Sequence, residues 1–306
     1  QRIKFLLVSY QQGLNSMKPV QFDYKRPATI EEACCFLAAD SNARVLAGGQ
    51  SLIPMLSMRL SRPSVLVDIA HIPELDKLVE TEDFVQFGSM VRQVKAEKNS
   101  TVKSHVPLLA KALYHVGHPP TRARGTIGGS IAHADPSAEI ALVAVTLNSQ
   151  ITYQDGDDEV AFAARDFFIG PMLTLAPSTG CLTNVKFPKA AAICGTGFHE
   201  VAPRRSDYAL ASAAAQINAD CGGKIETIHL GVGSIGDFPA SLDVDELLNV
   251  GLDDEAIRSV VHNAIVELET VGDLHASAAY RRRVGTELAI RALRDARDEI
   301  NMRLRQ

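Results

Sequence analysis

Two glycine pairs constrain this chain more strongly than any other feature of its sequence. One pair, at residues 48–49, follows a short apolar run at 45–47, and the second lies at 128–129. Glycine lacks a Cβ, so it adopts positive φ and lets backbone N–H groups approach a ligand. Each pair adjoins a segment with helical character and is followed by a hydroxyl residue, Ser51 or Ser130. A strand, a glycine turn and a helix start together form a site for an anion, most often a phosphate.

A single Gly-Gly pair is weak evidence, because roughly half or more of such pairs are simply tight turns. Two pairs of the same kind predict a ligand with two phosphates. Around the first pair, Gln50 adds a side-chain donor and Ser51 is a candidate cap for the next helix. Pro54 is tolerated in the first turn of that helix.

Bulk properties exclude several classes of protein. The chain has 306 residues, enough for two domains, and its net charge of −5 argues against nucleic-acid binding. No apolar run approaches the length of a membrane span. Five cysteines occur without C-x-x-C spacing, whereas iron–sulfur clusters and structural zinc sites require several closely spaced thiolates. We therefore expect no such cluster on this chain.

Strands and helices alternate through the first part of the chain, which indicates an α/β arrangement. The predicted elements are a helix after the capping box at 29–32, strands at 45–47, 65–69 and 84–88, a helix from Pro107, a helix at 138–147 that begins with Asp135 and Pro136, and a strand at 150–153.

The pattern changes after Pro177. Three candidate strands, at 181–187, 207–218 and 225–233, precede two helices, and a hairpin turn at 221–224 joins the last two strands. We predict a two-domain α+β chain whose second domain has a three-stranded antiparallel sheet plus helices. The domain limits are 17–180 and 181–306, with the boundary placed to within about ten residues.

Residues around the glycine pairs resemble a known family. The segments that carry the resemblance are 47–51 (Ala-Gly-Gly-Gln-Ser), 122–130 (Arg-x-Arg-Gly-Thr-Ile-Gly-Gly-Ser) and 132–136 (Ala-His-Ala-Asp-Pro). They are similar to the FAD-binding medium subunit of the molybdenum hydroxylases, a family that includes carbon monoxide dehydrogenase, nicotine dehydrogenase and bacterial xanthine dehydrogenase. The resemblance extends from about Met17 to the C-terminal helix. Residues 1–16 are treated as an N-terminal extension, since their apolar run is too short for a signal-peptide core.

The resemblance implies a set of cofactor-binding residues. The first loop, which would hold the FAD pyrophosphate, comprises Ala47, Gly48, Gly49, Gln50, Ser51 and Leu52, and the second loop comprises Thr126, Ile127, Gly128, Gly129 and Ser130. Asp135 and Glu139 match positions where relatives place an acid near the cofactor, and Leu182 matches an apolar residue that packs on FAD. Phe198 and His199 match a position where relatives present an aromatic or lysine side chain to the isoalloxazine ring. The lysine is missing here. An equally good interpretation is that Phe198 and His199 are ordinary strand residues.

Three further patterns favour structural interpretations. The segment 231–236 fits G-x-G-x-x-G, but Asp-Phe-Pro follows it directly, so no helix opens there as a dinucleotide fingerprint requires. His133 and Asp135 lack a third metal ligand nearby, and Asp135 is better explained as a helix cap. The arginines at 281–283 are interpreted as a solvated helix face rather than a partner contact.

The resemblance also implies a function. We expect an oxidoreductase subunit with noncovalent FAD and no catalytic or metal-binding residues of its own, which receives electrons from a small [2Fe–2S] subunit. A large subunit with molybdopterin would hydroxylate the substrate, in a cytoplasmic dimer of heterotrimers, and an external acceptor would take the electrons. Two alternatives stay open: a freestanding FAD-dependent oxidoreductase for a small substrate, and a non-enzymatic module that binds a phosphorylated ligand.

Overall fold

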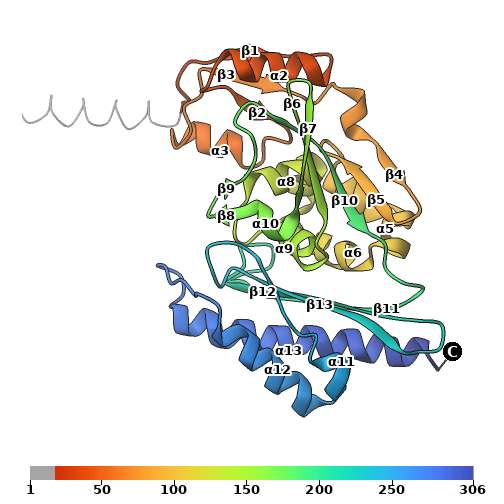
Figure 1. Cartoon of the computed structure of the whole chain (residues 1–306). Coiled ribbons are helices and arrows are strands. Elements are labelled where there is room, and N and C mark those ends of the chain that lie inside the picture. Colours follow the sequence, from red (N-terminus) through yellow and green to blue (C-terminus); the bar gives the residue numbers. More distant parts are fainter. Residues whose placement is uncertain (1–17, 306) are drawn as a thin grey trace, which may run out of the picture.

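The computed structural model describes residues 18–305, and the predicted extension at 1–16 lies outside this range. The elements stack in three levels (Figure 1): a small parallel sheet with two helices, a five-stranded sheet with short helices, and a four-stranded sheet covered by helices on its outer face. The fold is thus mixed α/β with several sheets. Within the described range, no helix combines the length and apolar character needed to cross a bilayer.

The first level is a parallel sheet in the order β1-β3-β2. Its strands are β1 (Asp23–Lys25), β3 (Val65–Asp68) and β2 (Arg44–Leu46). Helix α2 (Ile30–Ala39) begins as its sequence predicts: the Thr29 hydroxyl accepts from the Glu32 amide at 3.2 Å, and the Glu32 carboxylate accepts from the Ala28 amide at 2.7 Å. The first glycine pair lies between β2 and α3 (Leu52–Ser57).

The middle level is an antiparallel sheet in the order β4-β5-β10-β6-β7. Its strands are β4 (Leu78–Glu80), β5 (Phe84–Gly88), β10 (Cys181–Pro188), β6 (Gln150–Asp155) and β7 (Asp158–Ala163). The accompanying short elements are η1 (Pro73–Asp76), α4 (Gln93–Lys98), α5 (Ser100–His105), α6 (Pro107–Leu113), α7 (Pro119–Arg124), α8 (Ile127–His133), α9 (Glu139–Thr146), α10 (Ala164–Phe167), β8 (Phe168–Gly170) and β9 (Leu173–Thr174). Helix α9 is buried from Ile140 to Thr146 and belongs to the largest apolar core.

The third level corrects the predicted three-stranded sheet. Four antiparallel strands form it, namely β11 (Ile193–Val201), β12 (Ala211–Ala219), β13 (Ile225–Gly233) and β14 (Ala240–Leu242). The strand predicted at 181–187 is β10, which pairs with β5 and β6 in the middle sheet instead. The sequence indicated Phe198 and His199 as possible strand residues but did not predict β11 as an element, because Gly195 and Gly197 interrupt its apolar alternation.

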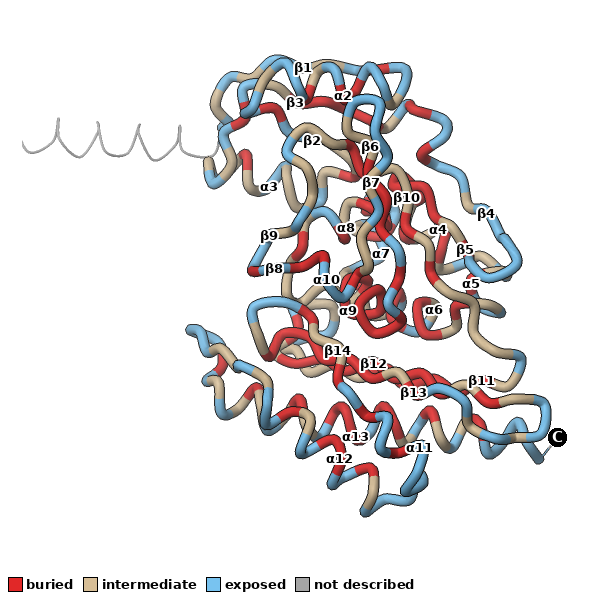
Figure 2. The backbone as a smooth tube through the Cα atoms, in the orientation of Figure 1, coloured by how far each residue is buried: buried red, intermediate tan, exposed pale blue. Residues whose placement is uncertain are grey.

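The two helices that the sequence predicts after the last strands lie on the outer side of this sheet. Helix α12 (Asp254–Val266) packs on α13 (Ala278–Arg303), and α13 lies along the outer face of β11, β12 and β13 (Figure 1). Buried residues line both sides of the sheet (Figure 2). Helices α6 and α9 pack on its inner face. The sheet therefore separates α13 from the middle level.

The G-x-G-x-x-G pattern at 231–236 is structural, as predicted. It lies at the end of β13 and continues into a bend, not a helix. A Cβ at Gly231 would come within 2.1 Å of the Thr146 hydroxyl on α9, so this glycine lets α9 approach the sheet. The nearness of α9 to β13 brings the start of α9 against the end of that strand.

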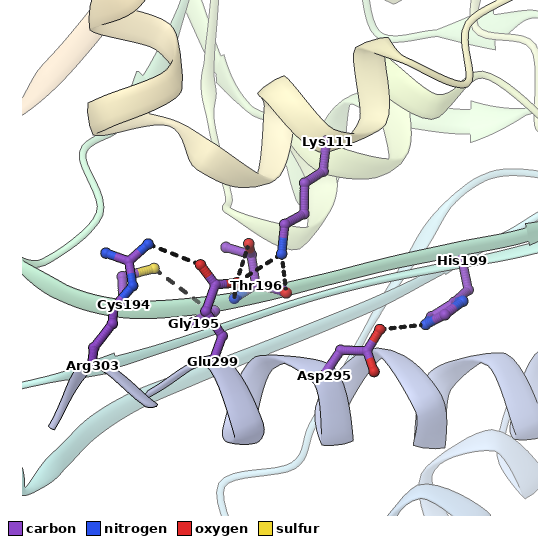
Figure 3. Close-up of polar contacts among 8 residues, drawn as sticks. All are labelled: Lys111, Cys194, Gly195, Thr196, His199, Asp295, Glu299 and Arg303. Atoms are coloured by element: carbon purple, nitrogen blue, oxygen red, sulfur yellow. Dashed lines mark hydrogen bonds and ion pairs between the residues drawn. The ribbon is translucent and has the colours of Figure 1, made fainter. Parts of the chain in front are cut away.

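A polar contact also joins the middle level to the third. Lys111 on α6 donates to the Thr196 carbonyl of β11 at 2.6 Å and to the Glu299 carboxylate of α13 at 2.7 Å (Figure 3). The Thr196 amide donates to the same carboxylate at 3.1 Å. β11 is an edge strand, so these contacts satisfy backbone groups that its sheet leaves unpaired.

Candidate functional site

The two glycine loops lie side by side. A Cβ added at Gly48 would lie 2.4 Å from the Arg124 carbonyl oxygen, and one added at Gly129 would lie 3.6 Å from the Ala47 Cβ. The chain thus brings together two segments that are far apart in sequence. Their contact is close enough that only glycine fits at position 48.

Within each pair the two glycines differ. Gly48 and Gly128 are buried, and a Cβ at Gly128 would lie 2.5 Å from the Ser89 Cβ. Gly49 and Gly129 are half-buried, so part of each remains accessible to a ligand. Gly49 has φ +73°, whereas the backbone of Gly129 is helical; the expectation of positive φ therefore holds only in the first loop.

The second loop is the start of a helix. The Thr126 hydroxyl caps α8 by accepting from the Gly129 amide at 2.9 Å, Ile127 and Gly128 are buried, and Ser130 is half-buried. In the first loop, Ser51 occupies the N-cap position of α3, but its side chain makes no capping hydrogen bond. The predicted cap role of Ser51 is therefore wrong, and its hydroxyl is not engaged by the helix.

Arg92 lies at the junction of the loops and was missed at the sequence level. Its guanidinium donates to the Arg124 carbonyl, the same group that Gly48 abuts, and its backbone bridges to Thr126. Burial lowers the pKa of Arg92, and the charge of Arg124 lowers it further. Two cationic side chains thus lie beside the glycine loops. No sequence signal marks Arg92, because only tertiary contacts bring it here.

Helix α8 leads from the glycine loops to the acidic residues. It contains seven residues, which at 1.5 Å each span about 10 Å. Asp135 follows it and accepts from the Ser137 amide at 2.8 Å and the Ser137 hydroxyl at 2.6 Å. The prediction that Asp135 caps the next helix is wrong: α9 begins at Glu139, because Asp135 organises a separate turn.

Glu139 is the most strongly perturbed acid at this end. Its pKa is raised from an ordinary 4.5 to about 8, chiefly by burial and also by the nearby charges of Glu200 and Asp135, while a backbone hydrogen bond and the charge of Arg122 act in the opposite direction. At this pKa the carboxyl is mostly protonated at neutral pH, so it has a proton to donate in a hydrogen bond. This feature was not evident from the sequence, because Glu200 reaches the site from β11.

The two predicted apolar residues lie in different places. Leu182 is 6% exposed, and the carbonyl of its neighbour Thr183 accepts from the Ser89 amide, next to Gly128. Phe198 on β11 is 8% exposed, and its ring centroid is 4.9 Å from that of His115. Leu182 thus adjoins the second glycine loop, and Phe198 lines the inner face of β11.

His199 points the other way. Successive residues of a strand face opposite sides of a sheet, so Phe198 and His199 cannot both face the middle level. The His199 ring lies 2.8 Å from the Asp295 carboxylate of α13 (Figure 3). The structure therefore does not bring His199 to the other predicted site residues.

The arrangement suits a long ligand with phosphates. Accessible glycine backbone and two arginines occupy one end of α8, and a protonated carboxyl beside buried apolar side chains occupies the other. These residues fit a flavin dinucleotide: its pyrophosphate requires backbone donors and positive charge, and its ring system requires apolar surface with a few polar contacts. The fold and site thus define a nucleotide-cofactor-binding protein.

Comparison with known proteins agrees with this class. The family described as the FAD binding domain in molybdopterin dehydrogenase matches residues 20–190, and the CO dehydrogenase flavoprotein C-terminal domain matches residues 197–296. The nicotine 6-hydroxylase medium subunit of Paenarthrobacter nicotinovorans is 35% identical, over 92% of this chain and 99% of that protein. Caffeine dehydrogenase subunit beta of a Pseudomonas species is 32% identical, over 93% and 97%.

Solved structures are similar as well. Carbon monoxide dehydrogenase of Hydrogenophaga pseudoflava superimposes with a TM-score of 0.88 at 29% identity, over 92% of this chain and 99% of the matched chain. Quinoline 2-oxidoreductase of Pseudomonas putida gives 0.86 at 32% identity, over 93% and 100%. The chain belongs to the family of FAD-binding medium subunits of molybdenum hydroxylases. It is the FAD-binding electron-transfer component of a multi-subunit oxidoreductase.

Proposed function

We propose that FAD binds noncovalently along α8, between the middle level and the four-stranded sheet. The observation that carries this proposal is the direct contact of the two glycine loops, each with one packed and one accessible glycine. The pyrophosphate lies against residues 47–52, where backbone N–H groups donate to it, and packs against residues 126–130, whose amides at 127–130 already donate within the chain. The positive charges of Arg92 and Arg124 offset its negative charge.

At the opposite end, the isoalloxazine ring takes the place nearest Glu139. With the ring bound there, the protonated Glu139 carboxyl would be able to donate a hydrogen bond to it, Asp135 holds the adjoining turn and Phe198 supplies apolar surface, while Leu182 lies beside the second glycine loop. His199 has no role in this arrangement, because its ring faces α13. The flavin supplies the redox chemistry when bound, while this chain positions it and limits water access. No general acid or base of this chain is required.

The wider assembly follows from the family. Electrons enter from [2Fe–2S] clusters of the small subunit, after substrate hydroxylation at the molybdopterin of the large subunit, and leave to an external acceptor. We infer a cytoplasmic dimer of heterotrimers. The proposal includes two domains, a vanillyl-alcohol-oxidase-like FAD domain at 17–180 and a flavoprotein domain at 181–306, with the limit placed to within about ten residues. The family relationship favours this function over a freestanding oxidoreductase or a phospholigand-binding module.

Acid precipitation of the purified chain tests the proposal. We expect the yellow chromophore to stay in the supernatant and to co-migrate with FAD on chromatography. Colour in the pellet would indicate a covalent link and would contradict the noncovalent part. Release of FMN, or a colourless chain that takes up no added FAD, would contradict the proposed cofactor site. In the reconstituted complex, substrate-driven flavin reduction should require both partner subunits; equally fast bleaching of the isolated chain would favour a freestanding enzyme.

A further inference from the structure

Of the arginine run at 281–283, Arg283 is exposed as the sequence predicts, but Arg281 is not. Arg281 is 7% exposed and lies in the first turn of α13, facing the sheet. Arg282 donates to the Leu268 carbonyl at 3.0 Å, and Arg283 lies over the Tyr280 ring. A buried arginine must be paired to be tolerated, so the partners of Arg281 indicate what it does.

Arg281 joins three segments that are distant in sequence. Its Nη1 donates to the Leu210 carbonyl at 2.8 Å and to the Ser234 carbonyl at 2.6 Å, and its Nη2 pairs with the Asp273 carboxylate at 2.7 Å. Leu210 ends the connection between β11 and β12, and Ser234 directly follows β13. One side chain therefore fixes two loops at the same end of the sheet.

Ser234 carries this constraint to the middle level. Its amide donates to the Pro136 carbonyl at 3.0 Å, and Pro136 directly follows Asp135 in the acidic turn. A hydrogen-bonded path thus runs from Arg281 through Ser234 to the turn before Glu139. Leu210 extends the path in another direction, because its amide donates to the Val201 carbonyl at 2.7 Å, one residue after Glu200.

We propose that Arg281 is a positioning residue, which sets the acidic turn at 134–139 against the C-terminal sheet and so orients the flavin end of the site. The inference rests on the proposed function, because it assigns the flavin ring to this end. Arginine suits this role because its planar guanidinium offers five donors in a fixed geometry, so one group binds two carbonyls and a carboxylate at once. The lysine ammonium is a point charge without that planar set of donors.

The test compares three full-length variants with the wild-type chain. Arg281→Gln removes the charge and the planar set of donors, Arg281→Lys keeps the charge alone, and Arg297→Gln is the matched control. Arg297 lies on the same helix and also binds a backbone carbonyl, that of Leu252, and an aspartate, Asp254, but it lies far along α13 from the acidic turn.

Three measurements separate positioning from general stability: the FAD dissociation constant by flavin-fluorescence titration, the visible circular dichroism of bound FAD, and amide exchange at 134–139 and 206–210 in the FAD-free chain. For Arg281→Gln we expect about tenfold weaker FAD binding, an altered visible dichroism, and faster exchange in both segments. Arg281→Lys should recover part of the affinity without restoring the dichroism. Arg297→Gln should speed exchange near 252–256 and leave FAD binding unchanged.

Normal affinity, dichroism and exchange at 134–139 in Arg281→Gln would overturn the inference, even if its melting temperature fell. Should Arg281→Gln not fold, Asp273→Asn decides instead: it removes only the half-exposed carboxylate, and we expect smaller changes in the same direction. No change in that variant would also overturn the inference. A wild-type chain that binds no FAD would instead refute the proposed function, and the exchange data on the FAD-free chain would still show whether Arg281 orders the turn.

Discussion

Glycines serve opposite purposes at two places in this molecule. On β11, a Cβ at Gly195 would lie 1.8 Å from the Ala296 carbonyl, and one at Gly197 would lie 2.0 Å from the Ala292 carbonyl. There glycine lets the α13 backbone approach the strand. At the loops, Gly49 and Gly129 are half-buried and would meet mainly side-chain atoms. There glycine leaves backbone accessible.

The difference shows how a structure separates packing glycines from ligand glycines. A packing glycine is buried against another backbone, which cannot move aside, whereas a ligand glycine has surface left over. The glycine pairs contain both kinds, since Gly48 and Gly128 are packed and Gly49 and Gly129 are accessible. The two kinds should therefore respond differently to substitution, the first in stability and the second in binding.

The largest effect is expected where α13 packs on β11. Gly195→Val should prevent stable folding, because the side chain would collide with the α13 backbone and overpacking costs at least about 3 kcal/mol there. Soluble yield and urea unfolding measure this. Gly170→Ala is the control: its nearest contact would be 3.6 Å, so its stability should change by less than about 1 kcal/mol. A Gly195→Val chain as stable as wild type would show that α13 and β11 separate easily.

Glu139 should show that the site, unlike the packing of α13 on β11, lowers the stability of the folded chain. Its folded pKa of about 8 lies above the ordinary 4.5, so the fold favours the protonated form and loses stability as pH rises between these values. The loss from pH 5 to pH 8 is roughly 3 kcal/mol. Glu139→Gln should remove this slope in the FAD-free chain and raise its melting temperature at pH 8 far more than at pH 5.

Melting curves at the two pH values measure the effect, with Glu226→Gln at an exposed strand position as the control. That control should leave the difference between pH 5 and pH 8 as it is in the wild type. An unchanged pH dependence in Glu139→Gln would mean that the Glu139 carboxyl is charged in the folded chain.

The two glycines of the second pair allow a direct comparison. Gly129→Val should keep the fold, with the Thr126 hydroxyl shifting from its place 2.7 Å from the new Cβ, but weaken FAD binding at least about a hundredfold, or roughly 2.7 kcal/mol, because the side chain would stand between the loops. Gly128→Val should instead destabilise the chain, since its Cβ would contact Ser89 at 2.5 Å. Far-UV circular dichroism and flavin occupancy distinguish them. Full occupancy in a folded Gly129→Val chain would argue against a cofactor role for this loop.

Much of this organisation could be predicted from local sequence. The capping box of α2, the hairpin turn after β12 and the non-helical end of the segment 231–236 all follow from short-range chemistry, and the structure confirms them. β11 was not predicted as an element because its glycines are explained only by the close approach of α13, which lies almost a hundred residues further along the chain. The strand at 181–187 was assigned to the wrong sheet, because apolar alternation does not reveal the partner of a strand.

The site shows the same division. The glycine loops and the acids at 135 and 139 are local motifs, and their residues could be named from the sequence. The raised pKa of Glu139, the orientation of His199 and the burial of Arg281 depend on neighbours from other elements. Arg92 belongs to this second group. Its substitution tests whether it binds phosphate through its charge or supports the loop through the Arg124 carbonyl.

Arg92→Gln should produce the smallest of these effects. It removes one of two cationic groups beside the glycine loops, so we expect about tenfold weaker FAD binding, equivalent to about 1.4 kcal/mol. The loss should shrink at high salt, because a partly exposed charge is screened. Riboflavin carries no phosphate, so any affinity it has should not change. Lys95→Gln is the control on the helix that follows Arg92, since Lys95 pairs with Asp76. If FAD and riboflavin affinities fell equally, Arg92 would support the loop through the Arg124 carbonyl rather than bind phosphate through its charge.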